Sequence, residues 1–364
     1  MRDDVGQLLW VGFQGTELPA ALGKRLDAGA YGAAILFRRN IRYVNDTADL
    51  AALVALNRDL HRTAPDGTPV LIAIDQEGGT VARLRAPATL WPPMMAHDRL
   101  APPDDVATAE QVGLAIGREL RAVGVDIDFA PVLDVHTNPA NPIIGERAFG
   151  TTAATVTRRA LAFARGLDAA GVLACGKHFP GHGDTDTDSH LALPRIDHDW
   201  ARLEAIELAP FRAAAEAQLP MVMTAHVVFA ALDAERPATL SDQVITGLLR
   251  ERLGYRGVIV SDDLDMKAIA ATMGADRAAV GAIRAGCDVV LLCCDETNQQ
   301  LAEEGLIKAG EGDSELRRRI GESAERVRTM KRAHAANQAK HPAPELEVIG
   351  SAEHRRLAER LAAH

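Results

Sequence analysis

Cysteine is scarce in this sequence, which has four among 364 residues: Cys175, Cys287, Cys293 and Cys294. All four lie in apolar runs, and their spacing lacks the paired pattern that metal ligands show. Buried free thiols of a protein from a reducing compartment are the simplest interpretation. We therefore expect no metal site built on cysteine.

Basic blocks and long apolar runs are also missing. The net charge is −10 and no cluster of lysine and arginine occurs, which argues against nucleic acid as a partner. The N-terminal stretch "MRDDVGQLLW" begins with acidic residues and does not resemble a signal peptide. No run of eighteen apolar residues occurs, so we expect no membrane span. These absences predict a cytoplasmic globular protein.

Eight short apolar runs recur along the chain, and most end in polar or charged residues. Each is continuously hydrophobic, as strands are when both faces of a parallel sheet are covered. The runs are 7–15, 33–40, 69–79, 126–135, 171–179, 220–227, 257–266 and 287–295.

Amphipathic helices are expected in most of the intervals between these runs. The helical period appears over 46–62, 106–123, 152–170, 200–217, 242–253 and 267–285. Asp46 and Thr152 are the expected N-caps of two of these helices, and Gly171 is the expected end of the second.

Strands that alternate with helices in this way predict the α/β class and a single (β/α)8 TIM barrel over residues 1–335. A polar tail with a helix is expected over 336–364. A doubly wound open sheet is the structural alternative, although no glycine-rich dinucleotide fingerprint follows the first strand.

Polar side chains stand where the predicted strands end, which is where a TIM barrel carries its active site. A single acid at such a place is most simply a helix cap or a solvated loop residue. Acids at four of the eight strand ends are harder to explain by structure alone. The residues at these ends are Asp75, Gln76, Glu77, Asp134, Lys177, His178, Thr224, His226, Asp262, Asp263 and Asp295.

The stretch "KHFPGHGDTDTDSH", residues 177–190, concentrates titratable groups on a segment broken by glycine and proline. One interpretation is a metallohydrolase that uses His178, His182, Asp184 and His190 as ligands. The stretch lacks the rigid spacing of a typical zinc site, which weakens that interpretation. The other interpretation pairs a carboxylate nucleophile at Asp262 with a proton donor on this loop, as in a retaining glycosidase. No cofactor or metal is expected in that case.

Five motifs together resemble glycoside hydrolase family 3, and in particular its bacterial β-N-acetylglucosaminidases of peptidoglycan recycling. They are "DQEGGTVARL", "NPIIGERAFG", "KHFPGHGDTDTDSH", "MTAHV" and "GYRGVIVSDDLDM", and the resemblance extends from about residue 7 to about residue 335. Many family members carry a second α/β sandwich domain after the barrel. Because the present sequence ends soon after the predicted barrel, we expect the single-domain arrangement of the other branch.

The resemblance also implies the roles of individual residues. Asp262 is the implied nucleophile, His190 the implied acid/base and Asp188 its partner. Histidine both donates and accepts protons near neutral pH, and a neighbouring carboxylate fixes its tautomer; a turn contact is the simpler interpretation of such a pair. The implied sugar-binding residues are Asp75, Arg83, Arg147, Lys177 and His178.

The resemblance implies an exo-acting retaining β-N-acetylglucosaminidase that releases terminal N-acetylglucosamine (GlcNAc) from peptidoglycan fragments. The expected partner is therefore a small carbohydrate, a GlcNAc-containing muropeptide fragment, and the expected state is a monomer. A glycoside phosphorylase on the same fold is the nearest alternative, because a neutral histidine would not repel phosphate. A β-glucosidase and a catalytically inactive sugar-binding barrel are further alternatives.

Overall fold

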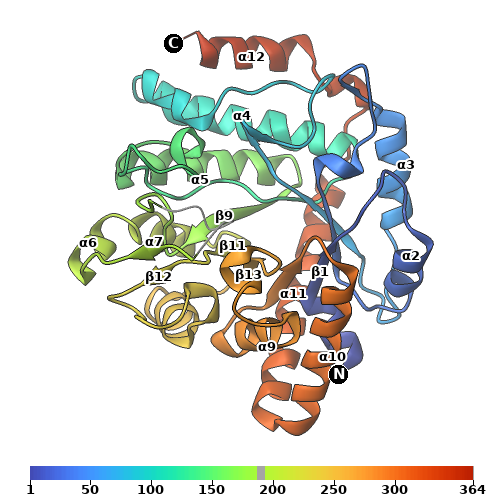
Figure 1. Ribbon diagram of the computed structural model, residues 1–364. Coiled ribbons are helices and arrows are strands. Elements are labelled where there is room, and N and C mark those ends of the chain that lie inside the picture. Colours follow the sequence, from blue (N-terminus) through green and yellow to red (C-terminus); the bar gives the residue numbers. More distant parts are fainter. Residues whose placement is uncertain (187–192, 364) are drawn as a thin grey trace.

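The computed structural model describes residues 1–186 and 193–363 of the protein. Eight parallel strands form a closed barrel in the order β1-β14-β13-β11-β9-β8-β5-β2 (Figure 1). All eight lie in the apolar runs identified in the sequence. Their bounds are β1 (Leu9–Gly12), β2 (Ala33–Leu36), β5 (Leu71–Ile74), β8 (Ile127–Asp128), β9 (Leu173–Phe179), β11 (Met221–Thr224), β13 (Val258–Asp263) and β14 (Val289–Leu292). The predicted barrel is confirmed, and the open sheet is not found.

The barrel is apolar on both of its faces, which explains why the strands read as continuous hydrophobic runs. Side chains such as Trp10, Ile127 and Met221 fill the interior. Side chains from the other face of the strands, such as Val11 and Val222, join the larger core beneath the surrounding helices.

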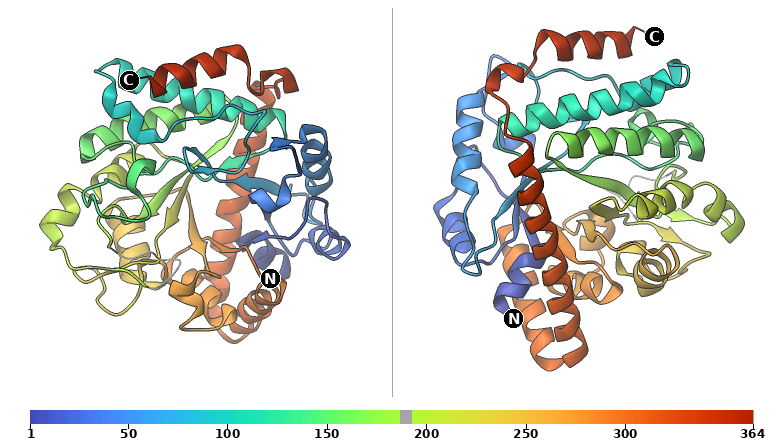
Figure 2. Two further views of the ribbon diagram at one scale, coloured as in Figure 1. Left: turned by 45° about the horizontal axis from the view of Figure 1, so that its top comes forward. Right: turned by 180° about the vertical axis from the view of Figure 1, so that it is seen from behind.

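Helices surround the barrel (Figure 2). The main ones are α1 (Arg2–Leu8), α2 (Ala20–Asp27), α3 (Leu50–Leu60), α4 (Asp104–Ala122), α5 (Ala153–Ala169), α6 (Trp200–Ala205), α7 (Ala209–Glu216), α9 (Ala275–Ala285), α10 (Glu296–Gly312), α11 (Ser314–Lys340) and α12 (Ala352–Ala362). The other helical elements are the short helix α8 (Lys267–Ala270), the π-helix η5 (Gln243–Arg252) and the 3₁₀ turns η1 (Arg38–Asn40), η2 (Met94–Arg99), η3 (Gly145–Arg147), η4 (Ala238–Leu240) and η6 (Leu346–Val348). Three small ribbons, β3–β4 (43–44 and 47–48), β6–β7 (76–78 and 81–82) and β10–β12 (195–196 and 228–229), lie outside the barrel.

Several predicted helix limits differ from the structure. The helix expected from Asp46 begins instead at Leu50, because residues 43–48 form a ribbon and Asp49 caps the helix by accepting from the Ala52 N–H at 2.9 Å. The helix expected over 200–217 is divided into α6 and α7, and that over 267–285 into α8 and α9. Thr152 caps α5 as predicted, and Gly171 follows its end with a positive φ of 78°.

Helix α11 crosses the end of the barrel at which the strands begin (Figure 2, right). The buried Lys331 ammonium donates to the Gln7 side chain at 2.8 Å and to the carbonyls of Gly32 and Pro69 at 2.7 and 2.8 Å. Val327 and Met330 of the same helix pack against the barrel interior. This end of the barrel is therefore closed, and the opposite end is left for a site.

The C-terminal part is ordered against the barrel. Helix α11 continues through residue 335 to Lys340, so the boundary predicted there falls inside a helix. The helix expected in the tail is α12, which lies beside α4 (Figure 1). The buried Glu119 of α4 accepts from His354 of α12 at 2.8 Å and from the Gly350 N–H at 3.0 Å. Among the described residues, no helix has the length and apolar character to cross a bilayer.

Candidate active site

A cavity of about 420 Å³ opens at the end of the barrel where the strands finish. Its floor includes interior side chains of the barrel, such as Phe129, Met223 and Leu291. It is lined by the six described residues to which the sequence analysis assigned the nucleophile and sugar-binding roles: Asp75, Arg83, Arg147, Lys177, His178 and Asp262. The structure therefore brings the proposed nucleophile and all five proposed sugar-binding residues into one cavity.

Five of the lining side chains form an ion-pair chain in the order Arg147, Glu77, Lys177, Asp75, Arg83. Arg147 binds Glu77 through two parallel hydrogen bonds of 2.8 Å. The Lys177 ammonium lies 2.5 Å from Glu77 and 2.8 Å from Asp75. Arg83 completes the chain with a contact of 3.1 Å to Asp75. Opposite charges alternate along the chain, so each side chain is held by its neighbours.

These contacts keep the buried groups ionised. Burial alone would raise the pKa of Glu77, but Arg147 and Lys177 outweigh it and lower that pKa to about 2. Burial would also raise the pKa of Asp75, but Lys177 and Arg83 outweigh it and hold that pKa well below its usual range. Burial would lower the pKa of Lys177, but the two carboxylates raise it. The cavity wall therefore presents fixed charges, which are strong hydrogen-bond partners for sugar hydroxyls.

Glu77 is a residue to which the sequence analysis assigned no role. Its side chain is 2% exposed, and it joins two residues that the sequence analysis did assign to the sugar, Arg147 and Lys177. Its position at a strand end, two residues after Asp75, was the available signal.

Asp262 and Asp263 end β13 and both line the cavity, although successive residues of a regular strand point to opposite sides. The register between β13 and β14 shifts between Val260 and Asp263, so the simple alternation of a strand is lost there. Hydrogen bonding distinguishes the two acids. Asp263 accepts the N–H groups of Cys293 and Asp265 at 3.1 and 3.0 Å and so braces the loop. Within residues 1–186 and 193–363, Asp262 accepts the Asp263 N–H at 2.8 Å.

Protonation also weakens Asp263 as a candidate nucleophile. Burial, Asp265 and Asp262 raise the pKa of Asp263 to about 7. A carboxyl group that is half protonated at neutral pH is a poorer nucleophile than an ionised one. The hydrogen bonds of Asp263 and its raised pKa therefore both argue against Asp263 as the attacking group.

His178 is fixed by a buried carboxylate beneath the cavity. Its Nδ1 lies 2.7 Å from Asp134, which also accepts the backbone N–H groups of His178 and His182 at 3.2 and 2.7 Å. Burial raises the pKa of Asp134, but His178 and His182 outweigh it and keep that pKa low. An ionised carboxylate only accepts, so Nδ1 of His178 carries the proton and Nε2 is left for the cavity.

The metal ligands considered in the sequence are not assembled as a ligand set in the described residues. His178 is bound to Asp134, His182 contacts Thr185 at 2.8 Å, and Asp184 contacts His198 at 2.5 Å. Burial and His178 lower the pKa of His182 to about 4, so it is neutral at pH 7. His190, the fourth candidate, lies outside the described residues, as does Asp188.

A different group, Asp263, Asp265 and Cys294, has ligand atoms within 4.8 Å of one another. Its carboxylates are already engaged as acceptors. Asp265 accepts the N–H groups of Cys294 and Asp295 at 2.8 and 3.3 Å and the Asn298 amide at 2.7 Å. This bonding joins the loops that follow β13 and β14.

The remaining strand-end residues do not line the cavity. Asp295 caps α10 by accepting from the Thr297 N–H, and Thr224 contacts Thr239 at 2.8 Å. His226 contacts Thr239, and its Nε2 lies 3.0 Å from the carbonyl oxygen of Asp263, so His226 borders the end of β13.

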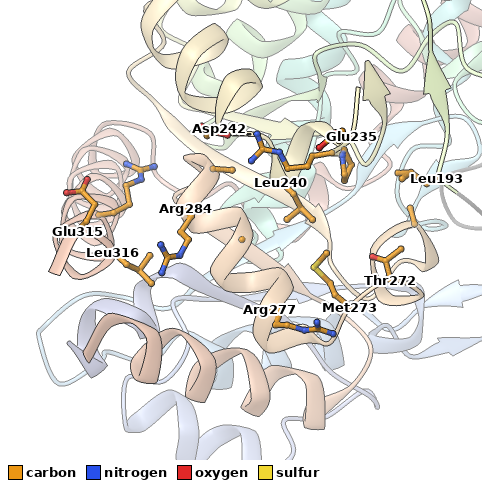
Figure 3. Close-up of a pocket in the computed structure, with 16 residues that line it drawn as sticks. Leu193, Glu235, Leu240, Asp242, Thr272, Met273, Arg277, Arg284, Glu315 and Leu316 are labelled. Carbon is orange, nitrogen blue, oxygen red and sulfur yellow. Dashed lines mark ion pairs between the residues drawn. The ribbon is translucent and has the colours of Figure 1, made fainter. Parts of the chain in front are cut away.

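A larger cavity of about 740 Å³ lies beside α9 on the outside of the barrel (Figure 3). Leu240, Met273 and Leu316 contribute apolar surface, and Arg277 and Arg284 stand around it (Figure 3). Among the residues that the structure describes, none of those proposed for catalysis or sugar binding lines this cavity. Size alone therefore does not locate the chemistry of this protein.

The sequence was also compared with protein families and named relatives. The model of the "Glycosyl hydrolase family 3 N terminal domain" matches residues 1–330. Beta-hexosaminidase A of Pseudoalteromonas piscicida is 40% identical over 290 residues, which are 76% of this chain and 48% of that protein. The chain thus spans about half the length of that relative. The beta-hexosaminidase of Bordetella parapertussis is 40% identical over 296 residues, which are 80% of each protein.

Solved structures show the same likeness over the whole fold. A glycoside hydrolase family 3 beta-N-acetylglucosaminidase from Paenibacillus sp. str. FPU-7 superposes with a TM-score of 0.90 at 40% identity, covering 100% of this chain and 68% of the other. NagZ from Neisseria gonorrhoeae, in complex with N-trifluoroacetyl-D-glucosamine, gives a TM-score of 0.77 at 31% identity, with 98% and 97% of the two chains covered.

Proposed function

The chain belongs to glycosyl hydrolase family 3, and from that membership and the cavity at its barrel mouth we propose that it is an exo-acting, retaining β-N-acetylglucosaminidase. One observation carries the proposal: Asp262 lines the same cavity as an ion-pair chain of fixed hydrogen-bonding groups. The relatives named beta-hexosaminidase and beta-N-acetylglucosaminidase support the choice of sugar.

The shape of the cavity supports exo action. Interior side chains of the barrel close it below, so a sugar enters from the mouth and meets a floor. The end of a glycan chain fits such a space better than its middle. In this orientation the terminal sugar lies against Asp75, Lys177 and Arg147, and the leaving group points to the mouth.

The proposed reaction has two steps. Asp262 attacks the anomeric carbon, the glycosidic bond breaks, and His190 gives its proton to the departing oxygen. His190 then takes a proton from water, the water oxygen bonds to the anomeric carbon, and the bond to Asp262 breaks. Asp188 keeps the His190 ring in one tautomer and stabilises its charged form.

His178 is the obvious competitor for the role of proton donor, because it faces the same cavity and is backed by Asp134. The departing sugar alkoxide is basic and needs a proton, whereas nitrophenolate leaves with little help. His190→Ala should therefore lose about 10²–10⁴-fold more kcat/KM on N,N′-diacetylchitobiose than on a nitrophenyl glycoside. His178→Ala should lose similar amounts on both, because it binds the sugar that both substrates share. The reverse pattern would transfer the acid/base role to His178.

A glycoside phosphorylase is the second candidate, and the charges of the ion-pair chain favour it. Its three cations exceed its two carboxylates by one positive charge, which would attract an anionic acceptor once the bond to the sugar has removed the charge of Asp262. Incubation with nitrophenyl β-N-acetylglucosaminide in phosphate buffer separates the two candidates. The proposal predicts free GlcNAc, and accumulation of GlcNAc 1-phosphate would replace it with phosphorolysis.

The natural substrate in this proposal is a GlcNAc-containing peptidoglycan fragment, processed by a monomer in the cytoplasm. The four free cysteines, three of them buried, support a reducing compartment. Comparison of nitrophenyl β-N-acetylglucosaminide with the matching β-glucoside tests the sugar. A higher kcat/KM on the glucoside would make the protein a β-glucosidase instead.

A further inference from the structure

Asp184 makes a hydrogen-bonding contact with a histidine from the other side of the segment that carries the proposed acid/base. Its Oδ2 lies 2.5 Å from Nε2 of His198, which stands just before α6. Its Oδ1 accepts a hydrogen bond of 2.6 Å from the Thr137 hydroxyl, in the loop after β8. Both oxygens of this carboxylate are therefore used to join three separate loops.

The pair is part of a larger bonded group and is not an isolated surface contact. The side chains of Asp184 and His198 are 20% and 29% exposed. Arg202 donates to the Thr137 hydroxyl and to the buried Glu207 carboxylate, both at 3.1 Å, and its guanidinium lies 3.7 Å from Asp184. Burial alone would raise the pKa of Asp184, but Thr137 and His198 outweigh it and lower the pKa.

Further bonds hold the chain on the N-terminal side of this segment. The Asn141 amide donates to the His182 carbonyl at 2.9 Å, and the Asn138 amide to the Thr185 carbonyl at 3.3 Å. The loop after β8 thus fixes the backbone up to residue 185, and the Asp184–His198 pair connects that fixed end with the chain that returns toward α6.

We propose that Asp184 and His198 are positioning residues for the acid/base. This inference rests on the proposed function, in which Asp188 and His190 supply the proton. Both lie in the chain between Asp184 and His198, so the pair holds the two ends of their segment together. Fixed ends reduce the number of conformations open to a segment. Placement errors of about 1 Å cost about 10²-fold in rate, so the effect of such a restraint is measurable.

The test uses Asp184→Asn and His198→Gln, each of which disrupts the contact between the carboxylate and the imidazole and keeps a side chain of similar size. A residue that acts by placing the proton donor matters most when the leaving group needs a proton. We expect kcat/KM to fall about 10- to 100-fold on N,N′-diacetylchitobiose and less than about threefold on nitrophenyl β-N-acetylglucosaminide. Equal losses on both substrates would mean that the pair only supports the fold, and would overturn the inference.

His61→Gln is a matched control. His61 also binds a carboxylate through Nε2, that of Asp126 at 2.8 Å, and its side chain is 34% exposed. This pair lies where β8 begins, at the closed end of the barrel. Its loss should lower Tm by a similar amount and leave the ratio of the two substrates unchanged.

Combination with His190→Ala separates the inference from the proposed function. If the pair acts through His190, adding Asp184→Asn to the His190→Ala variant should lower kcat/KM on the disaccharide little further. Additive losses would overturn the inference and leave His190 as the acid. If His190→Ala itself lost equally on both substrates, the proposed acid would be wrong, and the positioning role would be overturned with it.

Discussion

Replacement of Glu77 by glutamine tests whether the ion-pair chain organises the cavity. Glutamine keeps the size of the side chain and removes the charge that Arg147 and Lys177 share. Lys177 retains Asp75 as a partner at 2.8 Å, whereas Arg147 loses both of its carboxylate bonds. We expect Arg147 to lose its fixed orientation and Lys177 to remain nearly in place.

The expected loss of stability is large because the group is buried. Removal of one partner from a buried ion pair costs about 3–5 kcal/mol. Unfolding of a chain of this length has an entropy of about 0.8 kcal/mol/K near 60 °C, so Tm should fall by about 4–7 °C. The protein should still fold, since domains are typically stable by about 5–15 kcal/mol.

The expected loss of activity follows from Arg147. A hydrogen bond from a charged donor contributes about 1.5–3 kcal/mol, so kcat/KM on nitrophenyl β-N-acetylglucosaminide should fall about 10- to 100-fold. The inhibition constant of free GlcNAc should rise by a similar factor, because the sugar rather than the leaving group is affected. Steady-state kinetics and competitive inhibition measure both quantities.

Glu119→Gln is the control for stability alone. Glu119 is 3% exposed and binds His354 and the Gly350 N–H far from the cavity. It should lower Tm and leave KM unchanged. The reasoning fails if Glu77→Gln leaves kcat/KM within about threefold of the unmodified protein. It also fails if the effects of Glu77→Gln and Arg147→Ala add in the double variant, because a residue that acts through Arg147 cannot do so after its removal.

Three further predictions concern the nucleophile, metals and the closed end of the barrel. Asp262→Asn should lower kcat by several orders of magnitude and Asp263→Asn much less; the reverse order would move the nucleophile by one residue. Chelation with EDTA should leave the rate unchanged, because the proposed reaction uses only protein side chains; a loss restored by zinc would support the metallohydrolase interpretation. Lys331→Met should lower the free energy of unfolding by about 3 kcal/mol, because three buried acceptors lose their donor. The control Lys340→Met, at an exposed position, should change it by less than about 0.5 kcal/mol. Denaturant titrations measure both values.

The barrel was predictable because its strands are buried on both faces and leave a strong local signal. Residues 33–40 and 220–227 are recognisable as strands without any knowledge of their neighbours. The ends of helices are harder to predict, because neighbouring residues can be equally suitable as the N-cap. Asp46 and Asp49 are both acceptable caps by residue type, and the ribbon of residues 43–48 decides in favour of Asp49.

The family motifs identified the members of the cavity but not how they hold one another. Asp75, Arg147 and Lys177 were assigned to the sugar, while their connection through Glu77 was not anticipated. Asp184 was considered as a metal ligand, whereas its contacts are Thr137 and His198. Such pairings join residues from different loops, so neither spacing nor residue type predicts them.

The sequence by itself predicted the closed parallel barrel and the charged residues that line its mouth, because apolar runs and motifs are properties of adjacent residues. The tertiary structure decided which charges meet. Glu77 lies 70 positions from Arg147 in the chain, and Asp75 lies 102 from Lys177, yet each pair is in contact at 2.8 Å. Barrel closure brings the ends of distant strands to one rim, and burial there makes these contacts strong enough to fix the ionisation of every group involved.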